Sequence, residues 1–126
     1  MDKIEPEEKL TRFIFDSSAY RQLANTVKFQ AFMPNKNCEV SVFRISDVTD
    51  AEIWVIGECE VVPKRGKPIK GRADILTSDI QKHGLSVVPK EPPPKHANII
   101  HWKDTKEANQ AIAIELAAAA TFVKLE

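Results

Sequence analysis

The sequence has few glycines and no long apolar run, and each scarcity excludes a class of protein. Its 126 residues include only four glycines. There is no GxGxxG or GxxxxGK[ST] loop to cradle a phosphate, which argues against a dinucleotide enzyme and a P-loop ATPase. The HExxH, GxSxG and EF-hand patterns are also absent. No apolar stretch approaches the ~20 residues that span a bilayer, so no membrane association is expected.

Cysteine is equally scarce, and the N-terminal segment lacks the apolar core of a secretory signal. Residues 1–9 contain four acidic residues and a proline, which predicts a frayed acidic lead-in. A cytoplasmic location is therefore expected. Cys38 and Cys59 stand in no CxxC or CxxH motif, so we expect two small buried hydrophobic side chains in a reducing compartment. The sequence predicts neither a metal site nor a cofactor.

The length and the patterning predict one α+β domain over residues 1–126. We expect a mostly antiparallel sheet of about five strands, with one face covered by a C-terminal helix and one shorter helix. Short apolar or alternating segments at residues 11–16, 27–33, 38–45, 69–76, 85–88 and 96–102 are typical of strands. Residues 34–37, with proline and two asparagines, predict a hairpin between the second and third of these segments.

Two helix starts can be read from the sequence. Thr49 and Glu52 have the spacing of a capping box, which predicts a helix of two to three turns from Asp50. A second helix should begin near Asp104 and run to about residue 123, with an apolar stripe that docks on the core. The stripe comprises Ile112, Leu116, Ala119 and Val123.

Charge is balanced overall but unevenly distributed. The chain has 18 basic and 18 acidic residues, yet residues 61–103 contain nine Lys or Arg and three Asp or Glu. Alternation places Lys70 and Arg72 on the solvent-facing side of their strand. If that strand neighbours residues 96–102, the result is a basic patch with an aromatic edge. The predicted anion-binding residues are Lys64, Arg65, Lys67, Lys70, Arg72, Lys95, His96 and Trp102.

This pattern favours a non-enzymatic binding module whose anionic partner is nucleic acid or an acidic protein surface. The simpler interpretation is that these cations solvate a strand face, with Asp74 pairing Arg72. A purely structural subunit of a larger assembly is a third hypothesis.

An enzymatic alternative is a small metal-independent ribonuclease of the toxin type. Its catalytic candidates are Arg44, His96 and His101, with Arg72 and Asn98 in support. Histidine can act as acid or base while arginine holds the phosphate. Arg44 is also in register with an apolar row, which predicts a structural ion pair with Glu52 or Asp74.

Three strings resemble segments of small uncharacterised bacterial proteins. They are SVFR at residues 41–44, GRADI at 71–75 and PPPKHANI at 92–99. The resemblance spans most of the chain after Arg12 and implies a bacterial cytoplasmic source. It implies no activity, and it assigns a role to no residue of this chain.

Overall fold

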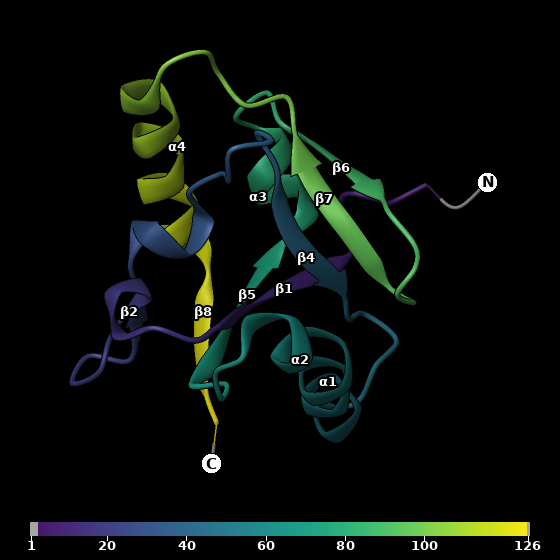
Figure 1. Cartoon of the computed structure of the whole chain (residues 1–126). Helices are drawn as coiled ribbons and strands as arrows, with labels where there is room; N and C mark the ends of the chain where they lie inside the picture. Colours follow the sequence, from purple (N-terminus) through teal and green to yellow (C-terminus); the bar gives the residue numbers. More distant parts are fainter. Residues whose placement is uncertain (1–2, 126) are drawn as a thin grey trace.

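An antiparallel sheet with the strand order β6-β7-β4-β1-β5-β8 organises the computed structural model, which describes residues 3–125 (Figure 1). Its strands are β1 (Lys9–Ile14), β4 (Val40–Arg44), β5 (Gly71–Leu76), β6 (Ser86–Pro89), β7 (His96–Ile100) and β8 (Thr121–Lys124). A separate two-stranded pair comprises β2 (Tyr20–Arg21) and β3 (Thr26–Val27). The predicted α+β class with an antiparallel sheet is confirmed, and the sheet has six strands.

The helices lie on both faces of this sheet, not on one face as predicted. One face packs against a helical segment made of α1 (Asp50–Ile56), the π-helical turn η3 (Gly57–Val61) and α2 (Val62–Arg65). The other face packs against the 3-10 turn η2 (Phe29–Phe32), α3 (Thr77–Gln81) and α4 (Lys106–Ala119). A further 3-10 turn, η1 (Ser17–Ala19), precedes β2. Strand side chains alternate between the two faces, so each helical layer receives its own apolar row.

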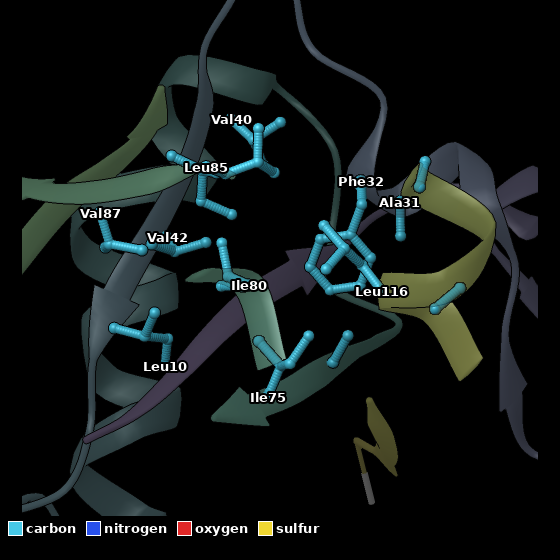
Figure 2. Close-up of a cluster of buried hydrophobic side chains, with 14 of the residues drawn as sticks. Leu10, Ala31, Phe32, Val40, Val42, Ile75, Ile80, Leu85, Val87 and Leu116 are labelled. Atoms are coloured by element: carbon cyan, nitrogen blue, oxygen red, sulfur yellow. The ribbon is translucent and has the colours of Figure 1, made fainter. Parts of the chain in front are cut away.

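The larger core lies on the α4 face and is mostly aliphatic. Figure 2 shows Leu10, Val42 and Ile75 of the sheet beside Ile80 of α3, with Phe32 and Leu116 next to one another. Leu10, Val42, Ile80, Phe32 and Leu116 are each fully buried. Burying such side chains contributes about 1.5–3 kcal/mol each. This face therefore contains most of the buried aliphatic surface.

The smaller core lies under residues 50–65 and is rich in phenylalanine. It consists of Phe13, Phe15, Phe43, Ile45, Ile53 and Ile69. The Phe13 and Phe43 rings meet edge to face, with centroids 5.8 Å apart. Gly57 allows the helical segment to approach them closely, because a Cβ there would lie 2.8 Å from the Phe13 ring.

The predicted capping box begins α1 as expected. The Thr49 hydroxyl accepts from the Glu52 N–H at 3.2 Å, and the Glu52 carboxylate accepts from the Thr49 N–H at 3.0 Å. The Thr49 N–H and the Thr49 hydroxyl, the latter at 3.0 Å, both donate to the Glu52 carboxylate and lower the pKa of Glu52, the backbone bond having the larger effect. The helix continues past Ile56 to Arg65 through the π turn. A π turn fits here because Pro63 has no N–H and its ring would clash with the carbonyl four residues earlier in an α-helix.

The predicted hairpin between residues 27–33 and 38–45 is wrong. Residues 29–32 form η2, and β4 pairs with β1 and β7. Ala31 and Phe32 are adjacent in sequence and both buried, a pattern that an extended strand on one face cannot satisfy. The contact of η2 with α4 overrides the local alternation.

The C-terminal helix is shorter than predicted. It ends at Ala119, and residues 121–124 pair with β5 as an edge strand. Its buried side chains are Asn109, Ala113, Leu116 and Ala117, so the predicted stripe is right only at Leu116, with Ile112 partly buried. Pairing with the sheet stabilises residues 121–124 more than one further helical turn would.

The structure also differs from two smaller predictions, on the cysteines and on the N-terminal residues. Cys38 and Cys59 are both exposed free thiols, so the expectation of buried cysteines is wrong. Ile4 is buried and the Glu8 carbonyl accepts from the Thr77 hydroxyl at 3.0 Å, so residues 4–8 pack onto the domain. The rest of the predicted frayed lead-in, at residues 1 and 2, lies outside the described residues.

Candidate functional site

The two strands expected to form the basic patch are not neighbours. β5 and β7 are separated by β1 and β4 in the sheet order, so about 14 Å of sheet lies between them. The reason is long-range pairing: β1 takes the centre of the sheet and pairs with β5 on one side and β4 on the other. The predicted set is therefore dispersed over several places.

Arg72 is buried under the helical segment, not on a solvent-facing strand surface as predicted. Its side chain is 4% exposed and donates to Asp74 at 3.0 Å and to Asp50 at 2.7 Å. The guanidinium also lies 4.8 Å from the centroid of the Trp54 ring. Burial opposes the charge, but the hydrogen bonds to Asp74 and Asp50 outweigh it and raise the pKa of Arg72. Arg72 is thus a paired structural cation, as the simpler interpretation expected.

Four other predicted residues also lie apart from one another. Lys67 pairs with Asp16 at 2.7 Å, and this hydrogen bond is the main cause of the lowered pKa of Asp16. Lys70 is exposed where the chain enters β5. Lys95 lines a separate cavity beside Arg44. Trp102 is not an exposed stacking platform, because it is 8% exposed in the larger core and its Nε1 donates to the Ile99 carbonyl.

The remaining predicted residues meet at one cavity. Lys64 and Arg65 of α2 and His96 of β7 line a hollow of about 140 Å³, together with Arg12 of β1. We call this hollow the Arg12 pocket. A smaller cavity of about 80 Å³ adjoins it and is also lined by Arg12 and Arg65. Three groups distant in sequence thus contribute positive or protonatable side chains to the same place.

Arg12 occupies an opening between β1 and β4. These strands pair only at Leu10 with Arg44 and at Thr11 with Phe43, whereas β1 pairs with β5 along its whole length. Beyond Thr11 the Arg12 side chain fills the gap. Its Nη1 donates to the Ser41 carbonyl at 2.9 Å. Its Nε donates to the carbonyl of Ala31, on η2, at 3.0 Å.

The charge of Arg12 has no carboxylate partner among residues 3–125, because both of its hydrogen bonds go to backbone carbonyls. Burial and the positive charge of Arg65 together lower the pKa of Arg12 to about 10. The side chain remains protonated at neutral pH, at an electrostatic cost. Three of its five N–H donors have no acceptor in the described chain.

The walls of the Arg12 pocket are largely apolar. They comprise Phe13, Phe15, Phe43, Val61, Pro93 and the ring of His96. The Arg65 guanidinium lies 5.2 Å from the centroid of the Phe15 ring. Glu60, on the π turn, is the one carboxylate among the lining residues of the described chain. The pocket is therefore a small hollow with aromatic and apolar walls, and Arg12, Lys64 and Arg65 are among its lining residues.

His96 is held in one orientation at the wall. Its Nδ1 lies 2.7 Å from the Lys90 carbonyl. A carbonyl only accepts, so Nδ1 carries the proton and the Nε2 atom is left for other contacts. The ring centroid lies 5.3 Å from that of Phe43.

The five residues of the ribonuclease hypothesis do not converge. His96 begins β7 and His101 follows its end, about 16 Å further along the strand. The His101 ring instead meets the Ser86 hydroxyl at 2.9 Å. Asn98 is buried beside Ser41, and Arg72 lies three strands away from β7 under the helical segment.

Arg44 is an ion-paired residue, but not with the predicted partners. It donates to both oxygens of Glu8 at 2.9 Å, and not to Glu52 or Asp74. Phe43, and not Arg44, is registered with His96. The Arg44 side chain therefore points to the face of the sheet opposite to that of Phe43.

Sequence reasoning missed Arg12, although the same signal that singled out Arg44 marks it. Arg12 stands within the apolar run of residues 10–15, in register with Leu10 and Ile14. A charged side chain in an apolar row costs free energy unless a counterion or hydrogen bonds compensate for its burial. The partner of Arg44 is a carboxylate, and Arg12 has none among the described residues.

Comparison of the chain with models of protein families, with curated proteins and with solved structures finds no match. Among residues 3–125, no three His, Cys, Asp or Glu side chains are grouped as metal ligands would be. Within the same described residues, no helix has both the length and the apolarity to cross a membrane. The Arg12 pocket is therefore the main indication of function in this chain.

Proposed function

We propose that the chain is a non-enzymatic binding module for an anionic partner, and that the anionic group enters the Arg12 pocket. The observation that carries this proposal is the half-buried guanidinium of Arg12, which meets another cation and no carboxylate in the described chain. A buried charge without a counterion costs free energy. An anion beside Arg12 and Arg65 would remove that cost and form charge-assisted hydrogen bonds.

A single anionic group fits this geometry better than a nucleic-acid backbone. A backbone would need a row of unpaired cations with exposed aromatic rings between them. Arg72 and Lys67 are paired with carboxylates, and Trp102 is in the core. Of the remaining predicted cations, Lys64 and Arg65 line one hollow together with Arg12, whereas Lys70 and Lys95 lie elsewhere.

The proposal predicts saturable binding of a simple anion at this place. Inorganic phosphate, titrated at constant ionic strength, should shift the backbone amide NMR signals of Phe13, Ser41 and Arg65. Arg65→Gln removes one charge from an exposed side chain and should weaken binding about tenfold, since hydrogen bonds to charged groups contribute about 1.5–3 kcal/mol. The Arg65 variant is preferred to an Arg12 variant because Arg12 also holds β1 and β4 together.

Lys82→Gln is the matched control. It removes the same charge from a side chain that is 63% exposed next to α3, on the other face of the sheet. Phosphate affinity should remain within twofold of wild type. The proposal fails if phosphate produces no saturable shifts, or if both variants weaken binding equally.

A further inference from the structure

The Arg12 pocket has more apolar wall than a bare anion requires. Phosphate or carboxylate oxygens need donors, which Arg12 and Arg65 supply. The lining also includes Phe13, Phe43 and Val61, whose side chains offer no donor at all. A ligand that consisted of an oxyanion alone would leave this apolar surface in contact with water.

The size of the hollow corresponds to one ring. Its volume is about 140 Å³. An apolar protein cavity of about 150 Å³ holds benzene. A second fused ring would exceed this volume. The space is therefore sufficient for one six-membered ring with a short substituent.

The arrangement of the walls suits an aromatic ring in particular. Phe13 and Phe43 already meet edge to face at 61°, and the His96 ring stands beside Phe43. A further ring can join such a cluster in edge-to-face or offset contact, which adds to the gain from burial alone. Arg12, Lys64 and Arg65 line the same hollow, so an anionic substituent on that ring would have a cation beside it.

We infer that the ligand of the Arg12 pocket is a single aromatic ring bearing an anionic group, with the ring against Phe13, Phe43 and Val61 and the anion between Arg12 and Arg65. This inference rests on the proposed function, because it names the class of anion that the pocket takes. The same chemistry is available from a free aryl phosphate or aryl carboxylate and from a phosphotyrosine side chain displayed by a partner.

The test compares two anions of equal charge, phenyl phosphate and methyl phosphate, by NMR titration and isothermal calorimetry. Burial of the ring should make phenyl phosphate bind at least about tenfold more tightly. 1-Naphthyl phosphate, which has two fused rings, should bind no more tightly than phenyl phosphate, because the hollow has room for only one of them. A phosphotyrosine tripeptide identifies the source of the aryl phosphate. Tighter binding than phenyl phosphate indicates a side chain displayed by a partner, whereas weaker binding indicates a free small molecule. Both results agree with the inference.

A substitution in the pocket wall distinguishes the binding of the ring from the binding of the anionic group. Val61 lies on the π turn at the wall and takes no part in binding charge. Val61→Phe should occupy the space for the ring and reduce the affinity for phenyl phosphate more than the affinity for methyl phosphate, so that the preference for phenyl phosphate is lost. Val55→Phe, on the exposed side of α1, adds the same ring away from the pocket and should change neither.

Equal affinities for phenyl and methyl phosphate at the pocket would overturn this inference and leave the proposed function standing. Retention of the phenyl preference in Val61→Phe would also overturn it, because the ring would then bind elsewhere. If neither phosphate bound at the pocket, the proposed function would fail and the inference with it.

Discussion

The two faces of the sheet are packed with different kinds of side chain. The α4 face joins aliphatic residues such as Leu10, Val42 and Leu116, each fully buried. The face under residues 50–65 combines a phenylalanine cluster with the buried Arg72 and with the Arg12 pocket. One face thus maximises apolar burial, whereas the other accommodates charge next to aromatic rings.

This difference indicates that residues important for stability and residues important for ligand binding lie mainly on different faces of the sheet. Dry aliphatic packing stabilises the fold without offering a ligand any polar contact. Charge buried next to a hollow costs stability, and it offers a ligand a polar contact. We therefore expect substitutions on the α4 face to alter the free energy of unfolding, and substitutions near α2 to alter anion affinity as well.

The largest effect is expected for Leu116→Ala in the middle of α4. Leu116 is fully buried, and such truncations cost about 2–5 kcal/mol through lost burial and the cavity left behind. Urea denaturation followed by circular dichroism measures this change. The folded variant should bind phosphate with wild-type affinity, and a parallel loss of affinity would contradict the separation of the two faces.

A smaller loss with a change in binding is expected for Gly57→Ala. The new Cβ would lie 2.5 Å from Ile69 Cδ1 and 2.8 Å from the Phe13 ring. Relief of these contacts must shift the helical segment away from Phe13, at a cost of about 2 kcal/mol. The shift should also change phosphate affinity, since the same segment continues to Arg65.

Gly84→Ala provides the control for this comparison. Gly84 has a φ of +83° after α3, so alanine there costs about 1 kcal/mol from backbone strain. Its phosphate affinity should equal that of wild type. Equal affinities in both glycine variants would show that the position of the helical segment does not affect the Arg12 pocket.

The smallest effect is expected for Asp16→Asn, and it depends on pH. Asp16 pairs with Lys67, which lowers the pKa of Asp16 below its ordinary value. A lowered carboxyl pKa stabilises the fold above the unfolded value of about 3.9, and this contribution is lost as the pH falls through the folded pKa. Thermal unfolding should show a slightly lower Tm for the variant at pH 6, a difference that shrinks progressively below about pH 4. A difference that persisted at pH 2 would exclude the ion pair as its cause.

Local sequence patterns correctly predicted the elements whose structure depends on residues close along the chain. The capping box of Thr49 formed as predicted, and residues 71–76 alternate between the two faces as their period indicated. The predicted strand at 27–33 was wrong because η2 buries two consecutive side chains under α4. Residues 121–124 were predicted as the end of the helix because the alanine-rich stretch leads directly into them, but pairing with β5 makes them an edge strand.

The sequence predicted part of the candidate site. Lys64, Arg65 and His96 were named from composition, and they do line one hollow. Trp102 and Arg72 were named on the same grounds, yet both are buried in other parts of the domain. Exposure depends on what covers a strand face, and a pattern of period two does not say which helix lies above it.

By itself the sequence determined the α+β class, the starts of two helices and the alternation of the strands, because these follow from contacts between residues close along the chain. Only the tertiary structure decided that β1 is central, that β1 and β4 part beyond Thr11, and that Arg12 fills the opening opposite Arg65. Strand order and helix placement arise from the burial of apolar surface between distant segments. Which charges meet, and whether a carboxylate is among them, is therefore a consequence of the whole fold.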